Sequence, residues 1–293
     1  SREETDASEA YRQLRNYMHE IPSMFIYNAI CVMSDQLTTK AGTITSGEDR
    51  FMEWKTKDGK YENTQYAQFD TFFEGMFQKE RLLDIIKNFI CFSNEGIKSF
   101  KILAGYHQYF AVRKAIESTK NATVTDGKGG VFWHTQGSGK SYSMLFLACK
   151  IRRKFAGSPT IVILTDREEL NKQISDTFEN CGVLGNVKAK SFIASSGDDL
   201  ITRLKGNPSF IFSLIQKFNK PDVEPIYPDH DIIVISDEAH RTQNGVFAEN
   251  LLHLLPTANR IGFTGTPLLR DDNITARTFG GYVSIYDFKR AVD

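Results

Sequence analysis

The sequence lacks a surplus of charge of either sign. Its 293 residues include 36 lysines and arginines against 36 aspartates and glutamates, so the formal net charge at pH 7 is zero. Without a basic surplus there is no bulk attraction to nucleic acid, and any surface that binds nucleic acid must be a local patch. Apolar residues make up 41% of the chain, which is enough for a sizeable core in one large domain or two ordinary ones.

Cysteine is scarce, and no long apolar run is present. The four cysteines are scattered and form neither a Cys-x-x-Cys pair nor a spacing typical of metal ligands. We therefore expect buried, reduced thiols in a cytoplasmic protein. No apolar run reaches the length of a membrane span, and the acidic, polar N-terminus is unlike a signal peptide. We expect this N-terminus to be a start within a domain.

The chain divides into two parts by its pattern of apolar residues. We expect a boundary near Asn94–Gly96, so that one domain covers 1–95 and the other 96–293. Before the boundary, polar and turn-rich stretches separate the expected elements. These are helices at 8–20 and 79–92 and strands at 25–34 and 51–56. The second helix is expected to turn inward an apolar face made by Leu82, Leu83, Ile86 and Phe89.

After the boundary, continuous apolar strands alternate with helices. Strands that are apolar throughout are typical of a parallel sheet covered by helices on both faces, so we expect an α/β fold. The strands are expected at 130–134, 160–165, 188–192, 209–214, 231–236, 260–264 and 282–286. The helices are expected at 107–120, 140–154, 167–179, 198–205 and 246–255. Ligands bind such sheets at the carboxyl ends of the strands.

One run, VFWHTQGSGKSYSMLFLACKI from Val131 to Ile151, combines a strand, a glycine loop and a helix. Gly137 and Gly139 permit a tight turn that aims backbone N–H groups at an anion, and the helix start adds its positive dipole end. Lys140 is placed to reach the terminal phosphates of a nucleotide, and Ser141 to bind Mg²⁺. The expected nucleotide contacts are Thr135, Gln136, Gly137, Ser138, Gly139, Lys140 and Ser141.

This loop departs from the general pattern G-x-x-x-x-G-K-[ST] at one position. His134 stands where the pattern has glycine, whereas the core Gly-Ser-Gly-Lys-Ser is intact. A short match of this kind also fits a glycine turn with a solvated lysine. The strand before the loop and the helix after it favour a nucleotide site, with ATP and Mg²⁺ as the expected ligands.

A second run, DIIVISDEAH, is an apolar strand followed by two adjacent acids. The strand delivers Asp237 and Glu238 to the sheet edge where the phosphate loop is expected. Mg²⁺ accepts one or two carboxylates and keeps most of its waters, so Asp237 is expected to hold the ion. Glu238 is then placed to position or deprotonate the attacking water, and His240 to sense the γ-phosphate. An ordinary acidic loop is the alternative for this run taken alone.

A third run, GFTGTP, follows the expected strand at 260–264. Small hydroxyl residues at a strand end can bridge the acidic motif and a bound polymer, and Thr264 and Thr266 are the candidates. The alternative is a tight Gly-Pro turn, which is common.

Together these motifs resemble those of superfamily 2 helicases and translocases. The closest resemblance is to the motor-and-nuclease (R) subunit of type I restriction enzymes, which carries the form WHTQGSGKS, so His134 is in keeping with that family. The resemblance extends over nearly all of the chain. It implies a RecA-like P-loop domain at 96–293, preceded at 1–95 by the C-terminal remnant of a restriction-endonuclease-like α/β domain.

Three further segments carry the resemblance and imply site residues. YHQYFAVRKAIE resembles the adenine-reading segment, which implies that Gln108 bonds to the adenine edge. A buried helix glutamine bonded to backbone is the alternative. ILTDREELNKQI and SLIQKF resemble segments near the nucleic-acid path, which implies DNA contacts by Arg167 and Lys217. A strand end followed by a capped helix fits both of these segments equally well.

QLRNY resembles the Q-x-x-x-Y element of the nuclease core that lies upstream of the motor in this family. Gln13 and Tyr17 fall on one helix face, so the resemblance implies that they point together at a nuclease pocket. A surface pair is the alternative. The acid-and-lysine pair of such a nuclease has no match in the chain, nor has the second motor domain with its arginine fingers. We expect a fragment that binds ATP and Mg²⁺, turns ATP over poorly and does not cut DNA.

For the parent protein, the resemblance implies ATP-dependent translocation on double-stranded DNA coupled to cleavage, in a complex with methyltransferase (M) and specificity (S) subunits. Two other functions remain open. One is an RNA helicase of the related DEAD/DEAH-box group, against which the nuclease-like segment and the form WHTQGSGKS argue. The other is an interaction module that changes shape on binding ATP, against which the adjacent acids Asp237 and Glu238 argue.

Overall fold

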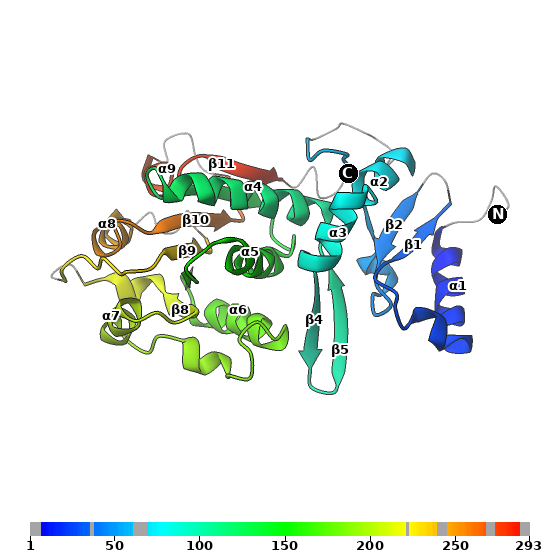
Figure 1. Cartoon of the computed structure of the whole chain (residues 1–293), viewed down its shortest axis with the longest axis horizontal. Helices are drawn as coiled ribbons and strands as arrows, with labels where there is room; N and C mark the ends of the chain where they lie inside the picture. Colours follow the sequence, from blue (N-terminus) through cyan, green and yellow to red (C-terminus); the bar gives the residue numbers. More distant parts are fainter. Residues whose placement is uncertain are drawn as a thin grey trace. The chain divides into compact units, whose positions relative to one another are not determined.

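The computed structural model describes residues 7–35, 38–60, 69–220, 223–238, 245–267 and 273–287. The chain forms two compact units, Ser1–Phe110 and Ala111–Asp293. Each unit has its own sheet and its own buried core (Figure 1).

The first unit begins with a helix packed on a small antiparallel sheet. Its elements are the helix α1 (Ala7–Glu20), a 3-10 turn η1 (Pro22–Phe25), and the strands β1 (Cys31–Ser34), β2 (Thr39–Gly42) and β3 (Met52–Glu53). The sheet order is β1-β2-β3. The core between helix and sheet is formed by Tyr11, Leu14, Met18, Phe25, Cys31, Met33 and Phe51. The helix agrees with the sequence prediction.

The strands of this sheet differ from the prediction. The strand expected from Phe25 begins only at Cys31, because Pro22 fixes the start of the 3-10 turn η1. The strand expected at 51–56 is reduced to Met52–Glu53. The turn-rich stretch contains β2, which pairs with both neighbours, since Ala41 lies opposite Val32 and Met52.

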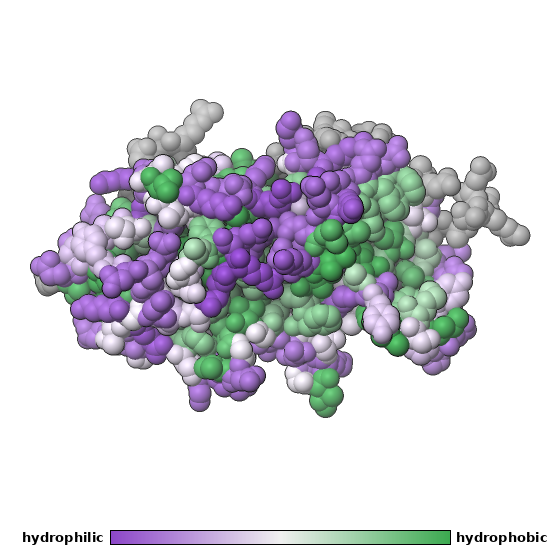
Figure 2. Space-filling model, viewed as in Figure 1, coloured by the Kyte–Doolittle hydropathy of each residue, from purple (hydrophilic) through white to green (hydrophobic). Residues whose placement is uncertain are grey.

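The rest of the first unit consists of two helices and a hairpin. These are α2 (Phe69–Met76), α3 (Lys79–Asn88), β4 (Ile90–Glu95) and β5 (Lys98–Leu103). The helix expected to run to residue 92 ends at Asn88, because Ile90 already pairs with Leu103. The expected inward face is correct for Phe89, which is buried, but wrong for Leu83 and Ile86, which are 59% and 44% exposed. Figure 2 shows an apolar area over this helix.

The expected boundary at 95/96 falls inside the hairpin. Asn94 pairs with Ser99 and Glu95 with Lys98, so the presumed linker is a two-residue turn between strands. The first unit extends to Phe110 because the start of α4 (Tyr106–Thr123) closes over Trp54, which is 2% exposed. The Trp54 ring lies 5.6 Å from that of Tyr109 and 5.8 Å from that of Phe110.

The second unit is built on a parallel sheet covered by helices, as the sequence predicted, and this sheet has six strands. The strands are β6 (Lys128–His134), β7 (Thr160–Thr165), β8 (Phe210–Leu214), β9 (Ile232–Ser236), β10 (Asn259–Thr264) and β11 (Tyr282–Tyr286). Their order is β11-β6-β10-β9-β7-β8. The strand expected at 188–192 is instead a 3-10 turn, η3 (Ala189–Phe192), in which the Ser191 N–H donates back to the Lys188 carbonyl.

Helices cover both faces of this sheet. The helices are α5 (Lys140–Lys154), α6 (Glu168–Asn180), α7 (Gly197–Lys205), α8 (Gly245–Leu254), α9 (Asn273–Phe279) and the remainder of α4. Alternate residues of β8 show the two layers. Phe178 of α6 packs edge-on against Phe210 and Phe212, whereas Ile211 belongs to the cluster that contains Leu200 of α7.

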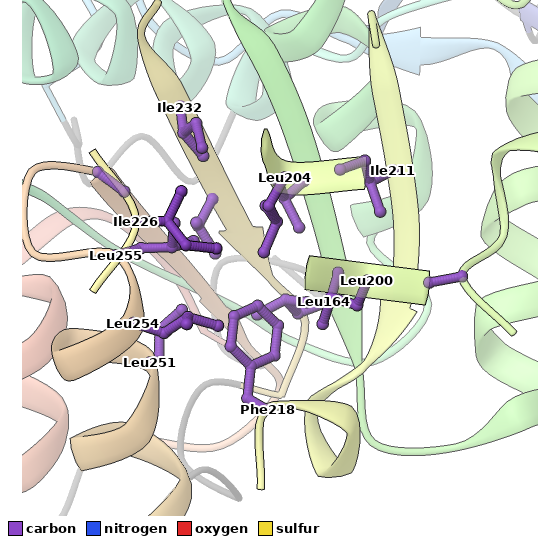
Figure 3. Close-up of a cluster of buried hydrophobic side chains, with 14 of the residues drawn as sticks. Leu164, Leu200, Leu204, Ile211, Phe218, Ile226, Ile232, Leu251, Leu254 and Leu255 are labelled. Carbon is purple, nitrogen blue, oxygen red and sulfur yellow. The ribbon is translucent and has the colours of Figure 1, made fainter. Parts of the chain in front are cut away.

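The cluster on the second of these faces is the largest described core (Figure 3). It joins strands β7, β8 and β9 to α7, to α8 and to the 3-10 turn η4 (Ile215–Phe218). Its labelled members are Leu164, Leu200, Leu204, Ile211, Phe218, Ile226, Ile232, Leu251, Leu254 and Leu255. Because the strands are apolar on both sides, this burial fixes the alignment of their carboxyl ends.

Gly130 in β6 is required by both its conformation and its surroundings. Its φ is +97°, and a Cβ would lie 2.1 Å from Val283 Cγ2 on β11. We expect Gly130→Ala to lower the free energy of unfolding by about 2 kcal/mol or more, as measured by urea denaturation. Gly281→Ala is the matched control, since a Cβ there meets nothing within 4 Å. Equal stability of the two variants would contradict this account.

Candidate active site

The loop between β6 and α5 has the backbone conformation of an anion cradle. Gly137 and Gly139 have φ values of +84° and +78°, a region in which side chains other than that of glycine are strained. A Cβ on Gly137 would meet nothing within 4 Å, so the space beside it is open. The first turn of α5 carries no acid, and the positive end of the helix dipole favours an anion there.

Lys140 lies at the point where three motifs meet. Its Nζ donates to the carbonyl of His134 at 3.3 Å. A Cβ on Gly265 would lie 3.4 Å from Lys140 Nζ and 3.7 Å from Glu238 Oε1. The ammonium of the first run and a carboxylate of the second therefore border the same small space, which the glycine of the third run leaves open.

The sheet order explains this meeting. β10 lies between β6 and β9, so the residues that follow these three strands emerge side by side at one edge. Directly after β9, the Asp237 N–H continues the ladder by donating to the Leu164 carbonyl at 2.8 Å. Glu238 then has φ +51°, an uncommon value for this residue type, and so turns the chain sharply at the strand end.

Asp237 is a buried acid, 6% exposed. Burial, and after it the nearby Glu238 carboxylate, raise its pKa to about 6, although the Lys140 ammonium opposes the shift. Its Oδ1 is buried and has no hydrogen-bond partner within the described ranges. A buried carboxylate oxygen without a protein donor fits a hard cation such as Mg²⁺, and Ser141 at the start of α5 supplies the hydroxyl that such a site uses.

The two threonines of the third run lie together. The Thr264 hydroxyl donates to the Thr266 carbonyl at 2.9 Å and accepts from the Thr266 N–H at 3.2 Å. Thr264 is buried, so its hydroxyl closes the turn after β10, while Thr266 is exposed. His240 lies outside the described residues.

Gln108 belongs to the first unit, and the phosphate loop to the second. Its side chain is 6% exposed, and its Oε1 accepts from the Gly105 N–H at 2.9 Å. This backbone bond is the one expected for the alternative interpretation, in which the glutamine caps the start of its own helix.

The two basic residues expected near nucleic acid have different surroundings. Arg167 precedes α6, and its side chain is 60% exposed with Nε 3.5 Å from Asp166 Oδ2. Lys217 donates instead to the carbonyl of Ala194. The neighbouring Gln216 donates to the Asp166 carbonyl at 2.9 Å, which ties the ends of β7 and β8 together. The Arg167 guanidinium is therefore accessible to solvent, whereas the Lys217 ammonium is bonded to the backbone at Ala194.

Gln13 and Tyr17 lie together on the exposed face of α1. Gln13 Nε2 donates to the Tyr17 hydroxyl at 2.8 Å. No group of three or more His, Cys, Asp or Glu residues suited to a metal occurs in the part of the chain that the structure describes. The pair thus has the geometry of the surface alternative.

Sequence reasoning missed Gly265 and the charge of Asp166 as parts of this site. Asp166 adds to the rise in the pKa of Asp237, although its motif pointed to nucleic acid. Gly265 sits between two threonines that drew attention by their hydroxyls. Gly265 could have been found from the sequence, because it is a glycine directly after a strand that ends at the same sheet edge as the phosphate loop.

A comparison with protein-family models identifies the second unit. Residues 107–293 match the model described as SWI2/SNF2 ATPase. The chain belongs to the SWI2/SNF2 ATPase family. The match starts one residue before Gln108 and includes the phosphate loop and both later motifs of this SWI2/SNF2 ATPase chain.

The chain is also similar to named restriction proteins. It is 38% identical, over its whole length, to the endonuclease subunit of the type I restriction enzyme HindI from Haemophilus influenzae, of which it covers 30%. It is 34% identical, over 97% of its length, to a Methanocaldococcus jannaschii protein named provisionally as the MjaIXP endonuclease subunit, of which it covers 29%. This SWI2/SNF2 ATPase chain thus spans less than a third of these relatives. The resemblance to R subunits is confirmed.

Among solved structures, the UvsW helicase from bacteriophage T4 is similar with a TM-score of 0.49 at 18% identity, covering 70% of this chain and 67% of that one. Separately, no helix within the described ranges combines the length and hydrophobicity needed to cross a lipid bilayer.

The raised pKa of Asp237 predicts a pH-dependent penalty on stability. The folded state holds this proton more tightly than the unfolded state, whose pKa is near the ordinary 3.8, so stability falls as pH rises from about 4 to about 6. We expect D237N to be more stable than the wild type at pH 7.5, by up to about 3 kcal/mol, and the difference to vanish below pH 4. Urea denaturation of the nucleotide-free chain across this range measures it.

The control is D198N, because the Asp198 side chain is 82% exposed and its neutralisation relieves no burial. A D237N variant whose advantage is the same at pH 4 and pH 7.5 would show that this carboxyl is not the titrating group.

Proposed function

We propose that this chain is the ATP-binding part of the restriction subunit of a type I restriction-modification enzyme, together with a piece of its nuclease domain. One observation carries the proposal: Lys140 Nζ and Glu238 Oε1 border the same space beside Gly265, next to the buried Asp237. At one sheet edge of this SWI2/SNF2 ATPase chain lie a lysine suited to bind phosphate, a carboxylate suited to bind a metal ion and a carboxylate suited to act as a general base.

In the proposed reaction, the loop from Thr135 to Gly139 and the first turn of α5 hold the phosphates through backbone N–H groups. Lys140 moves from the His134 carbonyl to the terminal phosphate oxygens. Ser141 and Asp237 would hold Mg²⁺, which would supply positive charge against the phosphate oxygens. A cation bound there would also favour the ionised form of Asp237, because a cation beside a carboxylate lowers its pKa.

Glu238 is proposed as the general base. It accepts a proton from the water that attacks the γ-phosphate, and its Oε1 borders the space beside Gly265 that Lys140 Nζ also borders. Thr264, Thr266 and His240 are proposed to couple this step to the bound polymer. Gln108 is proposed to read the adenine edge, in exchange for its bond to Gly105.

The proposed polymer is double-stranded DNA. The names of the relatives at 38% and 34% identity support this class of substrate, since both are endonuclease subunits of restriction enzymes. Arg167 supports it locally, as an exposed cation at the sheet edge. The parent protein is proposed to work in the cytoplasm with M and S subunits, and Gln13 and Tyr17 to line its nuclease pocket.

The experiment that tests the hydrolytic site is E238Q in the assembled enzyme. We expect ATP binding close to the wild type and hydrolysis in the presence of duplex DNA at least about 100-fold slower, since the base is removed and the cradle is kept. Phosphate release measures hydrolysis, and equilibrium binding measures affinity. E249Q, an exposed glutamate on α8, is the control.

Unchanged hydrolysis by E238Q would contradict the role of Glu238. Replacing the duplex DNA by RNA separates the proposal from an RNA helicase, because a restriction motor is expected to respond to duplex DNA alone.

The contrast between the two basic residues gives a second test. We expect R167A to weaken duplex binding and to reduce the slope of log affinity against log salt by about 0.9, the value for one lost phosphate contact. K217A is expected to lower the melting temperature and to leave that slope unchanged, because its ammonium holds a backbone carbonyl. Anisotropy of a labelled duplex at several salt concentrations measures the slope, and equal slopes for R167A and wild type would contradict the Arg167 contact.

A further inference from the structure

His134 is the residue of the phosphate loop that the general pattern does not explain. It occupies the first position, where the pattern has glycine, and it is fully buried at 0% exposure. An imidazole at this place must be packed and bonded, because a buried polar ring without partners is costly. The contacts of this ring and of its backbone join two parts of the second unit.

The ring faces the outer strand of the sheet. His134 Nε2 lies 3.0 Å from the Ser284 hydroxyl on β11, at hydrogen-bond distance. The ring also lies 5.8 Å from that of Tyr286 on β11 and packs edge-on against Phe132 at 5.7 Å. Tyr286 is opposite His134 in the strand register. The side chain is therefore held by β11 and by its own strand.

The backbone beside the ring faces the proposed ATP site. The His134 carbonyl accepts from Lys140 Nζ at 3.3 Å, and the next N–H, of Thr135, donates to the Tyr286 carbonyl at 2.9 Å. One peptide thus contacts both the phosphate-binding lysine and the end of β11. In the described sheet, β11 is the outermost strand and pairs with β6.

We infer that His134 is a positioning residue: through Ser284 it fixes the start of the phosphate loop against β11, and so couples nucleotide binding to the placement of that strand. The inference rests on the proposed function, in which this loop binds ATP. A loop held in its binding conformation loses less entropy when the nucleotide binds. Since such coupling is reciprocal, bound nucleotide must also change the stability of β11.

The test uses the whole chain and two measurements. Calorimetry gives the affinity for ATPγS in the presence of Mg²⁺, and thermal unfolding gives the melting temperature of each variant. S284A removes one hydroxyl and is expected to weaken binding roughly fivefold, the equivalent of one hydrogen bond. H134A is expected to weaken binding at least as much. In H134A, the further change S284A is expected to have no effect, because the partner is already gone.

Two variants separate positioning from folding. H134Q keeps a donor and an acceptor at the end of the side chain and is expected to restore most of the affinity. S213A is the matched control: Ser213 is a buried strand serine on β8, at the opposite edge of the described sheet, and its hydroxyl donates to the adjacent Leu214 carbonyl at 3.2 Å. It is expected to bind ATPγS like the wild type.

Hydrogen exchange in the wild type supplies a readout that needs no substitution. ATPγS is expected to slow exchange of the amides of 282–286, and this effect is expected to be smaller in S284A. The inference is wrong if S284A and S213A have the same affinity for ATPγS, or if the nucleotide does not change hydrogen exchange in β11. Either result would leave the proposed ATP site unaffected. If folded wild type fails to bind ATPγS and K140A changes nothing, the proposed function fails, and the inference falls with it.

Discussion

The arrangement of this site depends on one constraint, the alignment of neighbouring parallel strands. Because β10 lies between β6 and β9, the residues that follow these three strands emerge together, and Lys140, Gly265 and Glu238 border one space. The strands keep this alignment because they are buried on both faces by apolar contacts with the covering helices. A polar centre is thus assembled by residues far apart in the chain, and hydrophobic packing holds it in place.

The sequence predicted the second unit well because its signals are local and repeated. Strands β7 and β9 read as continuous apolar runs, and the glycines of the loop mark a turn that few other residues can make. The errors occur where partners are distant. Asn94–Gly96 looked like a linker because a hairpin turn and a linker share the same polar residues, and only the pairing of Glu95 with Lys98 distinguishes them. Likewise, Lys188–Phe192 has apolar residues but bonds within itself.

The ionisable side chains of the site show a similar limit to prediction from sequence. The strand-and-acid motif indicated Asp237, and the family resemblance implied Arg167 and Lys217. The surroundings of these three side chains depend on burial, which the sequence pattern does not give. Asp237 is raised in pKa to about 6 by burial, Arg167 is solvated, and Lys217 is engaged by a carbonyl. A chain with zero net charge can therefore place unlike ionisable groups at one sheet edge, each in a different environment. The sequence identifies these ionisable residues, whereas packing determines their exposure, their hydrogen bonds and their pKa values.

The left-handed backbone of Glu238 carries an evolutionary consequence. Glycine has no Cβ and adopts this conformation without steric penalty, so glycine here would relieve the backbone strain while it removed the carboxylate. Drift without selection would therefore erase the acid at this position sooner than at an unstrained one. A glutamate at this position therefore gives up backbone stability, a cost that the proposed use of its carboxylate in ATP hydrolysis would offset.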